Sequence, residues 1–249
     1  MNAGSKPMNE MIRLDNVSFG YKKAASTVKT AFYLSEITLD LFRGEAVVLA
    51  GRNGSGKTTL SKLMIGIFKP DKGDVFVDGY NLKKRTLAQT AKSAGYLFQN
   101  PERQLFCNTV LEEVMFSLRH TGIYQKDADQ DAVQPALAEA SAIEKAKSLL
   151  AQFSLSEKEA SYPLKLSGGE KQRLALLTIL AMELEYYILD EPSKGLDEGN
   201  REILIEILAG LKRAGKGLCI ITHDAALAGS LADRRILMEK GRVVRDEKT

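Results

Sequence analysis

Cysteine, net charge and long apolar runs are all scarce in this sequence of 249 residues. The two cysteines, Cys107 and Cys219, lie far apart in apolar stretches, so we expect buried thiols in a reducing compartment and no disulfide. The 35 basic and 32 acidic residues leave an excess of only +3, which does not predict nucleic-acid binding. The longest nearly uncharged apolar run, residues 174–182, is far shorter than the ~20 residues that a membrane-spanning helix needs. If the protein works at a membrane, another chain must span it.

The N-terminal residues 1–10 are polar and contain no apolar signal-peptide segment, so we expect a flexible tail there. Hydrophobic residues make up 44% of the chain and charged residues 27%, which is typical of a folded globular protein. A chain of this length could hold one large domain or two small ones. The resemblance described below covers nearly the whole chain and implies one domain over residues 11–249.

A glycine-rich loop is the most informative stretch, because it matches the phosphate-binding template G-x-x-x-x-G-K-[ST]. An apolar run precedes it and apolar residues at helical spacing follow it, as the motif requires. Glycines let backbone N–H groups surround a phosphate, the lysine brings positive charge, and the threonine hydroxyl can ligate Mg²⁺. An ordinary strand-to-helix turn explains less, since four fixed positions and both flanks agree. We therefore predict binding of a nucleoside triphosphate by Gly51, Arg52, Asn53, Gly54, Ser55, Gly56, Lys57, Thr58 and Thr59.

Strand and helix patterns alternate along the rest of the chain. Alternating apolar residues predict half-exposed antiparallel strands at residues 11–21 and 35–42. Apolar strands at 93–98, 186–190 and 218–222 alternate with helices, which predicts a parallel sheet with right-handed connections. Residues from about 101 to 165 predict an inserted helical subdomain whose helices are interrupted at Gly122 and Pro135. A helix from about 200 to 213 and a final hairpin at 235–244 complete the pattern.

Ligands of such a sheet bind at the carboxyl ends of its strands, where Gly51, Gln99, Glu191 and His223 fall. Asp190 and Glu191 close one apolar strand and place two carboxylates near the phosphate loop. One acid can hold Mg²⁺ directly or through water, and its neighbour can orient or deprotonate a water molecule. A carboxylate pair that only caps the next loop is the weaker interpretation. His223 alone would more often be a packed residue at a strand end.

A second glycine-containing motif, Leu166-Ser167-Gly168-Gly169-Glu170, opens a long apolar helix. Free N–H groups and the positive end of the helix dipole would suit a phosphate here. Because the chain already has one phosphate loop, a second anion site suggests that two chains share their nucleotides.

In this order, the motifs resemble those of the nucleotide-binding subunit of ATP-binding cassette (ABC) transporters over nearly the whole chain. The resemblance rests on the phosphate loop, Gln99 after a strand, residues 166–170, the acidic strand end, residues 193–197 and His223. It implies an α/β P-loop NTPase with a RecA-like parallel sheet, an antiparallel β subdomain and an inserted helical subdomain. It also implies hydrolysis of ATP with Mg²⁺ in a head-to-tail dimer.

The resemblance further implies a role for each residue of the motifs. Tyr21, which its position alone would assign to the core, would stack on adenine. Mg²⁺ would be held by Thr58, Gln99 and Asp190, with Gln99 also sensing the membrane partner. Glu191 would be the general base and His223 would hold the γ-phosphate and the water. The remaining contacts would cross the dimer interface, through Ser167, Gly168 and Gly169 to the opposite γ-phosphate and through Asp197 between the two sites.

Residues 98–106 (Phe-Gln-Asn-Pro-Glu-Arg-Gln-Leu-Phe) are similar to the segment after that glutamine in energy-coupling factor transporter ATPases. Arg103 stands where that group often has an acidic residue, and Arg52, Thr58 and Lys194 replace other usual residues, but no catalytic group is lost. The resemblance implies import of a vitamin or of a cobalt or nickel ion. The subunit would lie peripherally on the cytoplasmic face of the membrane. It would bind a scaffold subunit and a substrate-binding subunit that span the membrane, and pair with a copy of itself or with another cassette.

Of three other functions, one stays open and two are less consistent with the sequence. Another type of ABC importer or exporter shares the same motifs and stays open. A soluble ABC protein that acts on ribosomes or DNA needs two cassettes or a coiled-coil insertion, and the about 110 residues between Lys57 and Ser167 contain no heptad run. A non-hydrolysing regulatory subunit would lack Glu191 or His223, and both are present.

Overall fold

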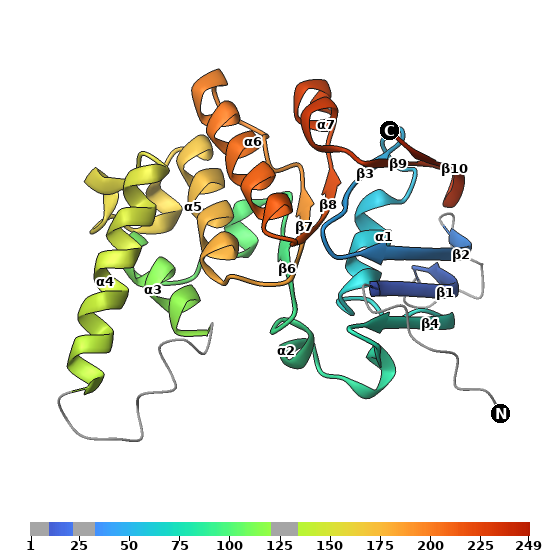
Figure 1. Cartoon of the computed structure of the whole chain (residues 1–249), viewed down its shortest axis with the longest axis horizontal. Coiled ribbons are helices and arrows are strands. Elements are labelled where there is room, and N and C mark those ends of the chain that lie inside the picture. The colour runs from blue at the N-terminus through green and yellow to red at the C-terminus, as the bar shows by residue number, and fades with distance from the viewer. Residues whose placement is uncertain (1–9, 22–32, 121–133) are drawn as a thin grey trace.

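The structure is a computed structural model that describes residues 10–21, 33–120 and 134–249. Residues 1–9 of the predicted tail and the predicted interruption at Gly122 lie outside the described residues. Figure 1 shows most helices toward one end of the molecule, one β-sheet toward the other end and strands of a second sheet between them. Among the described residues, no helix combines the length and the apolar character needed to cross a membrane.

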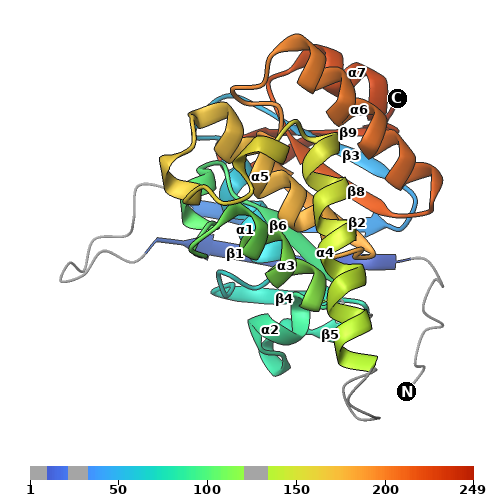
Figure 2. The same ribbon diagram turned by 90° about the vertical axis from the view of Figure 1, so that its left-hand side faces the viewer.

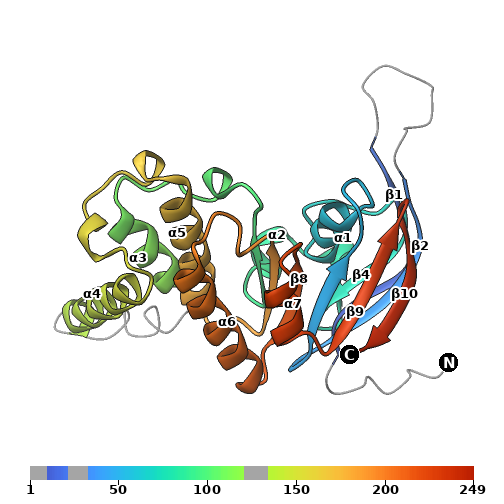
Figure 3. The same ribbon diagram turned by 90° about the horizontal axis from the view of Figure 1, so that it is seen from above.

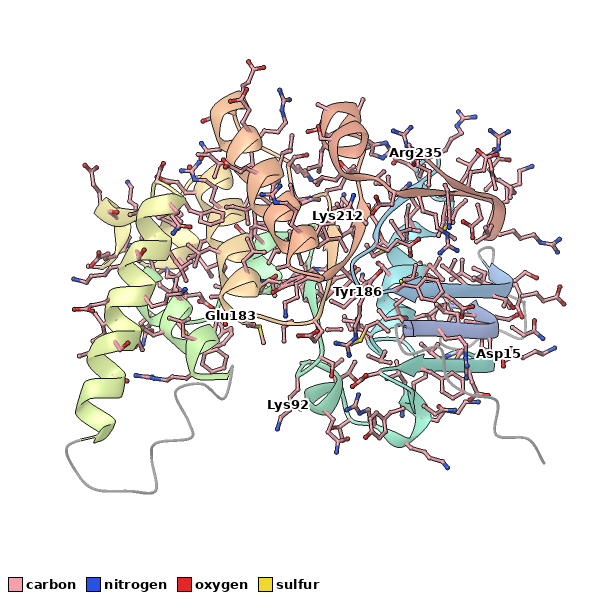
Figure 4. The ribbon with its side chains drawn as sticks, viewed as in Figure 1. Asp15, Lys92, Glu183, Tyr186, Lys212 and Arg235 are labelled. Atoms are coloured by element: carbon pink, nitrogen blue, oxygen red, sulfur yellow. The ribbon has the colours of Figure 1, made fainter. Side chains whose placement is uncertain are left out.

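A six-stranded sheet with the order β10-β9-β3-β8-β7-β6 forms the centre of the fold. The neighbouring strands from β9 to β6 are parallel, and β10 is antiparallel to β9. The bounds are β3 (Ala46–Ala50), β6 (Ala94–Leu97), β7 (Tyr186–Asp190), β8 (Gly217–Ile221), β9 (Arg234–Glu239) and β10 (Arg242–Lys248). Strands β7 and β8 are buried throughout, as apolar strands covered on both faces should be. Tyr186, which starts β7, lies in the interior of the molecule in Figure 4. The predicted parallel α/β core is confirmed.

A four-stranded antiparallel sheet with the order β2-β1-β4-β5 packs against this core. Its strands are β1 (Glu10–Gly20), β2 (Tyr33–Phe42), β4 (Lys72–Val77) and β5 (Tyr80–Asn81). Apolar side chains of both sheets form one buried cluster with Leu60, Leu63 and Met64 of helix α1 (Lys57–Met64). Figure 3 shows α1 beside these strands. The helix that follows the glycine-rich loop is therefore fixed by the core on both sides.

Five other helices form a second cluster with the far face of the central sheet, in which two of them pack on α5 (Gly168–Ala181) rather than on the strands, as Figure 2 shows from that side. They are α3 (Val110–His120), α4 (Gln134–Gln152), α5, α6 (Glu198–Arg213) and α7 (Ala225–Leu231). Pro135 lies in the first turn of α4, where the missing N–H of proline costs little. The predicted interruption at Pro135 is therefore the start of a helix. The sequence did not predict α7 or the short helix α2 (Leu87–Thr90).

Both cysteines are free thiols, as predicted, but they differ in burial. Cys219 lies on β8 and is fully buried, which raises its pKa to about 12. Cys107 is only half-buried, so the prediction of a buried thiol is wrong there. It follows the exposed Phe106 in the loop between Arg103 and α3, where the apolar stretch does not face the core. Burial and the nearby carboxylates of Glu113 and Glu112 still raise the pKa of Cys107 to about 11.

Candidate active site

A cleft of about 410 Å³ opens at the carboxyl ends of β3, β6, β7 and β8. It gathers residues that are up to 202 positions apart in the sequence, from Tyr21 to His223. Its lining consists of Tyr21, Asn53, Gly54, Gly56, Lys57, Thr58, Thr59, Gln99, Asp190, Glu191, Ile221 and His223. Every one of these residues except Ile221 was predicted from the sequence as a site residue. The cleft therefore joins the phosphate loop to the acidic strand end and to the histidine.

The glycine-rich loop has a backbone that only glycine adopts easily. Gly51 has a φ of +142°, and a Cβ atom at this position would lie 2.3 Å from the carbonyl oxygen of Met238. Gly56 precedes α1 with a left-handed backbone and provides no side-chain cap. The first N–H groups of α1 thus face the cleft without a capping side chain, which favours an anion at this end of the helix.

Lys57 is folded back onto its own loop. Its Nζ donates hydrogen bonds to the carbonyl oxygens of Gly51 at 2.6 Å and Arg52 at 3.2 Å. Burial lowers the pKa of Lys57 from 10.5, while the nearby carboxylates of Glu191 and Asp190 raise it. Within the described part of the chain, the hydrogen-bond acceptors of the ammonium group are these two neutral carbonyl oxygens, which a phosphate would replace with charged ones.

Asp190 is the buried acid of the cleft. It ends β7, is only 1% exposed, and its Oδ2 accepts a hydrogen bond of 2.9 Å from the Thr58 hydroxyl. A weaker contact of 3.4 Å comes from the hydroxyl of Tyr96. Burial raises the pKa of Asp190, and the hydrogen bond from Thr58 opposes this rise most strongly. The carboxylate and the Thr58 hydroxyl form a pair of oxygen donors beside the phosphate loop.

Glu191 and His223 meet over the mouth of the cleft. Oε1 of Glu191 lies 3.6 Å from Nε2 of His223, and the same nitrogen lies 3.1 Å from Oδ1 of Asn53. The backbone N–H of Glu191 donates to the carbonyl oxygen of Ile221 at 2.8 Å, which ties the end of β7 to the end of β8. Glu191 has a φ of +55°, a strained value for a residue other than glycine that often occurs at functional sites. The chain therefore holds this carboxylate in one place at the cost of backbone strain.

Three predicted residues of the loop, Gly51, Arg52 and Ser55, do not line the cleft. Arg52 has an exposed side chain and contributes only its carbonyl oxygen, as an acceptor for Lys57. Ser55 is buried, and its Oγ has no hydrogen-bond partner among the described residues. Arg52 and Ser55 therefore support the shape of the loop through their backbone.

The predicted residues of the second anion site lie outside this cleft. Ser167 caps α5 in a reciprocal pair with Glu170, whose Oε2 accepts the Ser167 N–H at 2.8 Å. Hydrogen bonding to Ser167 lowers the pKa of Glu170. Gly168 is exposed and Gly169 half-buried beside the backbone of Gly195. In the same way Asp197 is exposed and caps α6 through the N–H of Asn200 at 2.8 Å. Within one chain these residues do not touch the cleft.

Three polar residues that support the cleft were not predicted. Ser61 and Tyr96 have hydroxyls 3.1 Å apart, and both are buried behind Asp190. Gln172 is buried on α5, and its Nε2 donates to the carbonyl oxygen of Glu191 at 3.2 Å. Gln172 lies among the polar residues that precede the apolar run 174–182, so the sequence pattern gave no signal for it. Tyr96 on an apolar strand reads as an ordinary core aromatic.

Comparison with known proteins agrees with this geometry. The family described as "ABC transporter" matches residues 34–194. A protein of Pyrococcus furiosus, provisionally named an ABC transporter ATP-binding protein, is 41% identical over 233 residues, which cover 94% of this chain and 82% of the relative. The energy-coupling factor transporter ATP-binding protein EcfA2 of Methanospirillum hungatei is 36% identical over 239 residues, which cover 95% of this chain and 55% of that protein.

Among solved structures, this chain is similar in fold to an ATP-binding cassette that was solved as a dimer in a post-hydrolysis state with ADP and Pi bound. Its TM-score is 0.80 at 27% sequence identity, and the match covers 96% of this chain and 98% of that one. The similarity therefore spans both sheets and the helical end of the molecule.

Proposed function

Because the chain belongs to the ABC transporter family and is an ATPase subunit, we propose that it powers import of a vitamin or transition-metal ion. The observation that carries this proposal is the convergence of Lys57, Asp190, Glu191 and His223 on one cleft. Two findings favour the energy-coupling factor subgroup. They are the similarity of residues 98–106 to that group and the 36% identity to EcfA2.

In the proposed binding step, the triphosphate of ATP replaces the backbone acceptors of Lys57. The Nζ atom would leave the carbonyl oxygens of Gly51 and Arg52 for the β- and γ-phosphates, while the N–H groups of the loop and of α1 surround them. Tyr21 is 43% exposed at the edge of the cleft, where its ring would stack on adenine. Its hydroxyl lies 3.0 Å from Oγ1 of Thr59, which fixes the ring relative to the loop.

The oxygen donors of the cleft suit Mg²⁺. Thr58, Gln99 and Asp190 offer a hydroxyl, an amide oxygen and a carboxylate, which are the hard ligands that this ion prefers. Among the described residues no three His, Cys, Asp or Glu side chains form a metal cluster, so phosphates and water would complete the coordination. Thr58, Gln99 and Asp190 would hold the ion, whose positive charge would offset the negative charge of the phosphates.

Hydrolysis would then depend on Glu191. Its carboxylate would accept a proton from the water that attacks the γ-phosphate, and His223 would orient that water and the phosphate. Gln172 and Ile221 hold the backbone of Glu191 from two sides. This support would keep the carboxylate in line with the phosphate during the reaction.

The proposed working unit is a head-to-tail dimer with two nucleotides at its interface. Ser167, Gly168 and Gly169 would contact the γ-phosphate in the cleft of the opposite subunit, and Asp197 would connect the two sites. Ser167, Gly168 and Asp197 are exposed at the starts of α5 and α6, which leaves them accessible for this contact. The second subunit would be a copy of this chain or a different cassette. A scaffold subunit and a substrate-binding subunit would span the membrane, with the ATPases attached to its cytoplasmic face.

Gentle solubilisation of native membranes, followed by identification of the proteins that co-purify with this chain, tests the proposal. We expect a small substrate-binding membrane protein together with a larger scaffold protein. Recovery of a pair of conventional permeases would contradict the energy-coupling factor assignment and support another type of ABC importer. Recovery with ribosomes or DNA instead of membrane proteins would contradict a role in transport.

A further inference from the structure

The segment that follows Gln99 is fastened to helix α5 by two separate polar links. In the first link, Nε2 of Gln104 donates hydrogen bonds to the carbonyl oxygen of Ala175 at 2.7 Å and to Oγ1 of Thr178 at 2.8 Å. In the second, Nζ of Lys171 lies 2.6 Å from Oε1 of Glu102. Lys171, Ala175 and Thr178 follow the spacing i, i+4, i+7, so one face of α5 makes all three contacts.

The segment itself is stiff. Residues Pro101–Arg103 form one 3₁₀ turn that packs on α5. Asn100 caps this turn by accepting the Glu102 N–H at 3.1 Å, and the Gln104 N–H donates to the carbonyl oxygen of Pro101 at 3.0 Å. A displacement of Gln99 should therefore move α5 as well, because the hydrogen bonds within residues 100–104 limit bending of the segment between them.

Only one half of the Gln104 amide is hydrogen-bonded among the described residues. Its Oε1 is buried without a hydrogen-bond partner among the described residues. An unpaired buried amide oxygen costs free energy that an apolar side chain of similar size would avoid. Both N–H groups of the amide donate hydrogen bonds to α5, while its oxygen accepts none from the residues that the structure describes. Because an apolar residue would avoid the cost of the unpaired oxygen, the presence of glutamine here suggests a role in function.

We propose that Gln104 is a positioning residue that makes the segment after Gln99 and helix α5 move as one piece. The helix begins at Ser167, the cap that would be offered to the nucleotide of the opposite subunit. A nucleotide that displaces Gln99 in one cleft thus adjusts the cap that closes the other cleft. This inference rests on the proposed function, because it presumes that Gln99 contacts the nucleotide–metal complex and that two chains form the dimer.

The test measures ATP-dependent dimerisation of the full chain by light scattering, in a Glu191→Gln background that slows hydrolysis. Gln104→Met keeps the size of the side chain, removes both hydrogen bonds and removes the unpaired oxygen. We expect the protein concentration for half-dimerisation to rise by about fivefold or more, the usual range of a coupling between two sites. Binding of a fluorescent ADP analogue to the monomer should not change, because Gln104 does not line the cleft.

The second link provides a rescue experiment that a general loss of stability would not reproduce. Lys171→Glu and Glu102→Lys should each weaken dimerisation, and the two changes together should restore it because the ion pair re-forms with its charges exchanged. Gln152→Met is the matched control, since Gln152 is an exposed glutamine at the end of α4. It should dimerise like the parent. If Gln104→Met does not fold, Thr178→Val removes one acceptor of the same link and answers the question instead.

Failure of this inference differs from failure of the proposed function. If the Glu191→Gln parent forms no dimer with ATP, the proposed two-subunit mechanism is wrong. If the parent dimerises and folded Gln104→Met or Thr178→Val dimerises at the same concentration, the positioning role of Gln104 is overturned. Loss of dimerisation in both exchanged single variants without rescue in the double variant overturns the link between Glu102 and Lys171.

Discussion

Thr58 in the glycine-rich loop donates a hydrogen bond of 2.9 Å to Oδ2 of Asp190, which lies 132 residues further along the chain. The contact joins the first turn of α1 to the end of β7, and Tyr96 approaches the same oxygen from β6. A buried carboxylate that accepts hydrogen bonds keeps one orientation, and these bonds partly oppose the rise in the pKa of Asp190 that burial causes. This hydrogen bond therefore holds two of the oxygen donors proposed for Mg²⁺ side by side.

Thr58→Val tests this arrangement, because it keeps the branched shape and removes the hydroxyl. We expect the Mg²⁺ concentration for half-maximal ATP hydrolysis to rise by about tenfold or more, since a hydrogen bond to a charged group contributes about 1.5–3 kcal/mol. Binding of ATP in the presence of a chelator should change much less. Thr58→Ser retains the hydroxyl and is the control. An unchanged Mg²⁺ requirement in Thr58→Val would contradict the metal-binding role.

Glu191→Gln tests the general base. We expect turnover to fall by ~10²–10⁴, the usual contribution of a general base, while ATP still binds and holds two subunits together. Steady-state phosphate release and size-exclusion chromatography with ATP measure the two effects. Glu202→Gln, on the exposed side of α6, should leave both unchanged. Normal phosphate release in Glu191→Gln would exclude Glu191 as the base.

The cleft was largely predictable from the sequence because its residues obey local rules. The loop has fixed spacing, and Asp190, Glu191 and His223 each follow an apolar strand that ends at the same edge of a parallel sheet. Strand order did not have to be known, since parallel strands bring their carboxyl ends together in any order. Ile221 is the one lining residue that was not predicted, because it is an apolar residue of β8 and has no polar group that would mark it as a site residue.

Contacts between strands and helices were not predictable in the same way. The approach of Tyr96 to Asp190 depends on the pairing of β6 with β7, in which Tyr96 stands opposite Ile188. The link from Gln104 to α5 depends on how a single 3₁₀ turn packs. Neither leaves a periodic pattern in the sequence. Short elements such as α7 escaped for a related reason, because seven residues give too little of the helical period.

Glu170 should make the stability of the protein depend on pH. Hydrogen bonding to Ser167 lowers the pKa of Glu170 in the folded protein below its ordinary value of 4.5. Unfolding then takes up a proton at low pH, so the contribution is present above pH 4.5 and is lost as the pH falls through the lowered folded-state pKa. Glu170→Gln keeps an acceptor for the Ser167 N–H but has no charge. In urea unfolding, we expect the variant to be less stable than the parent at neutral pH and the difference to shrink on acidification. A difference that stays constant with pH would contradict this origin.

Gly51 and Gly54 occupy the same loop but meet different surroundings, which makes them a matched pair. A Cβ atom on Gly54, at a φ of +79°, would have no other atom within 4 Å, so Gly54→Ala should cost only the left-handed backbone strain of about 1–2 kcal/mol. A Cβ atom on Gly51 would lie 2.3 Å from the carbonyl oxygen of Met238 and 2.8 Å from Oγ of Ser55. Gly51→Ala must therefore move β9 or the loop. We expect it to unfold at a lower urea concentration than Gly54→Ala and to bind a fluorescent ATP analogue more weakly. Equal unfolding midpoints for the two variants would mean that the structure accommodates a Cβ atom at Gly51. The inference that the loop requires glycine there would then be wrong.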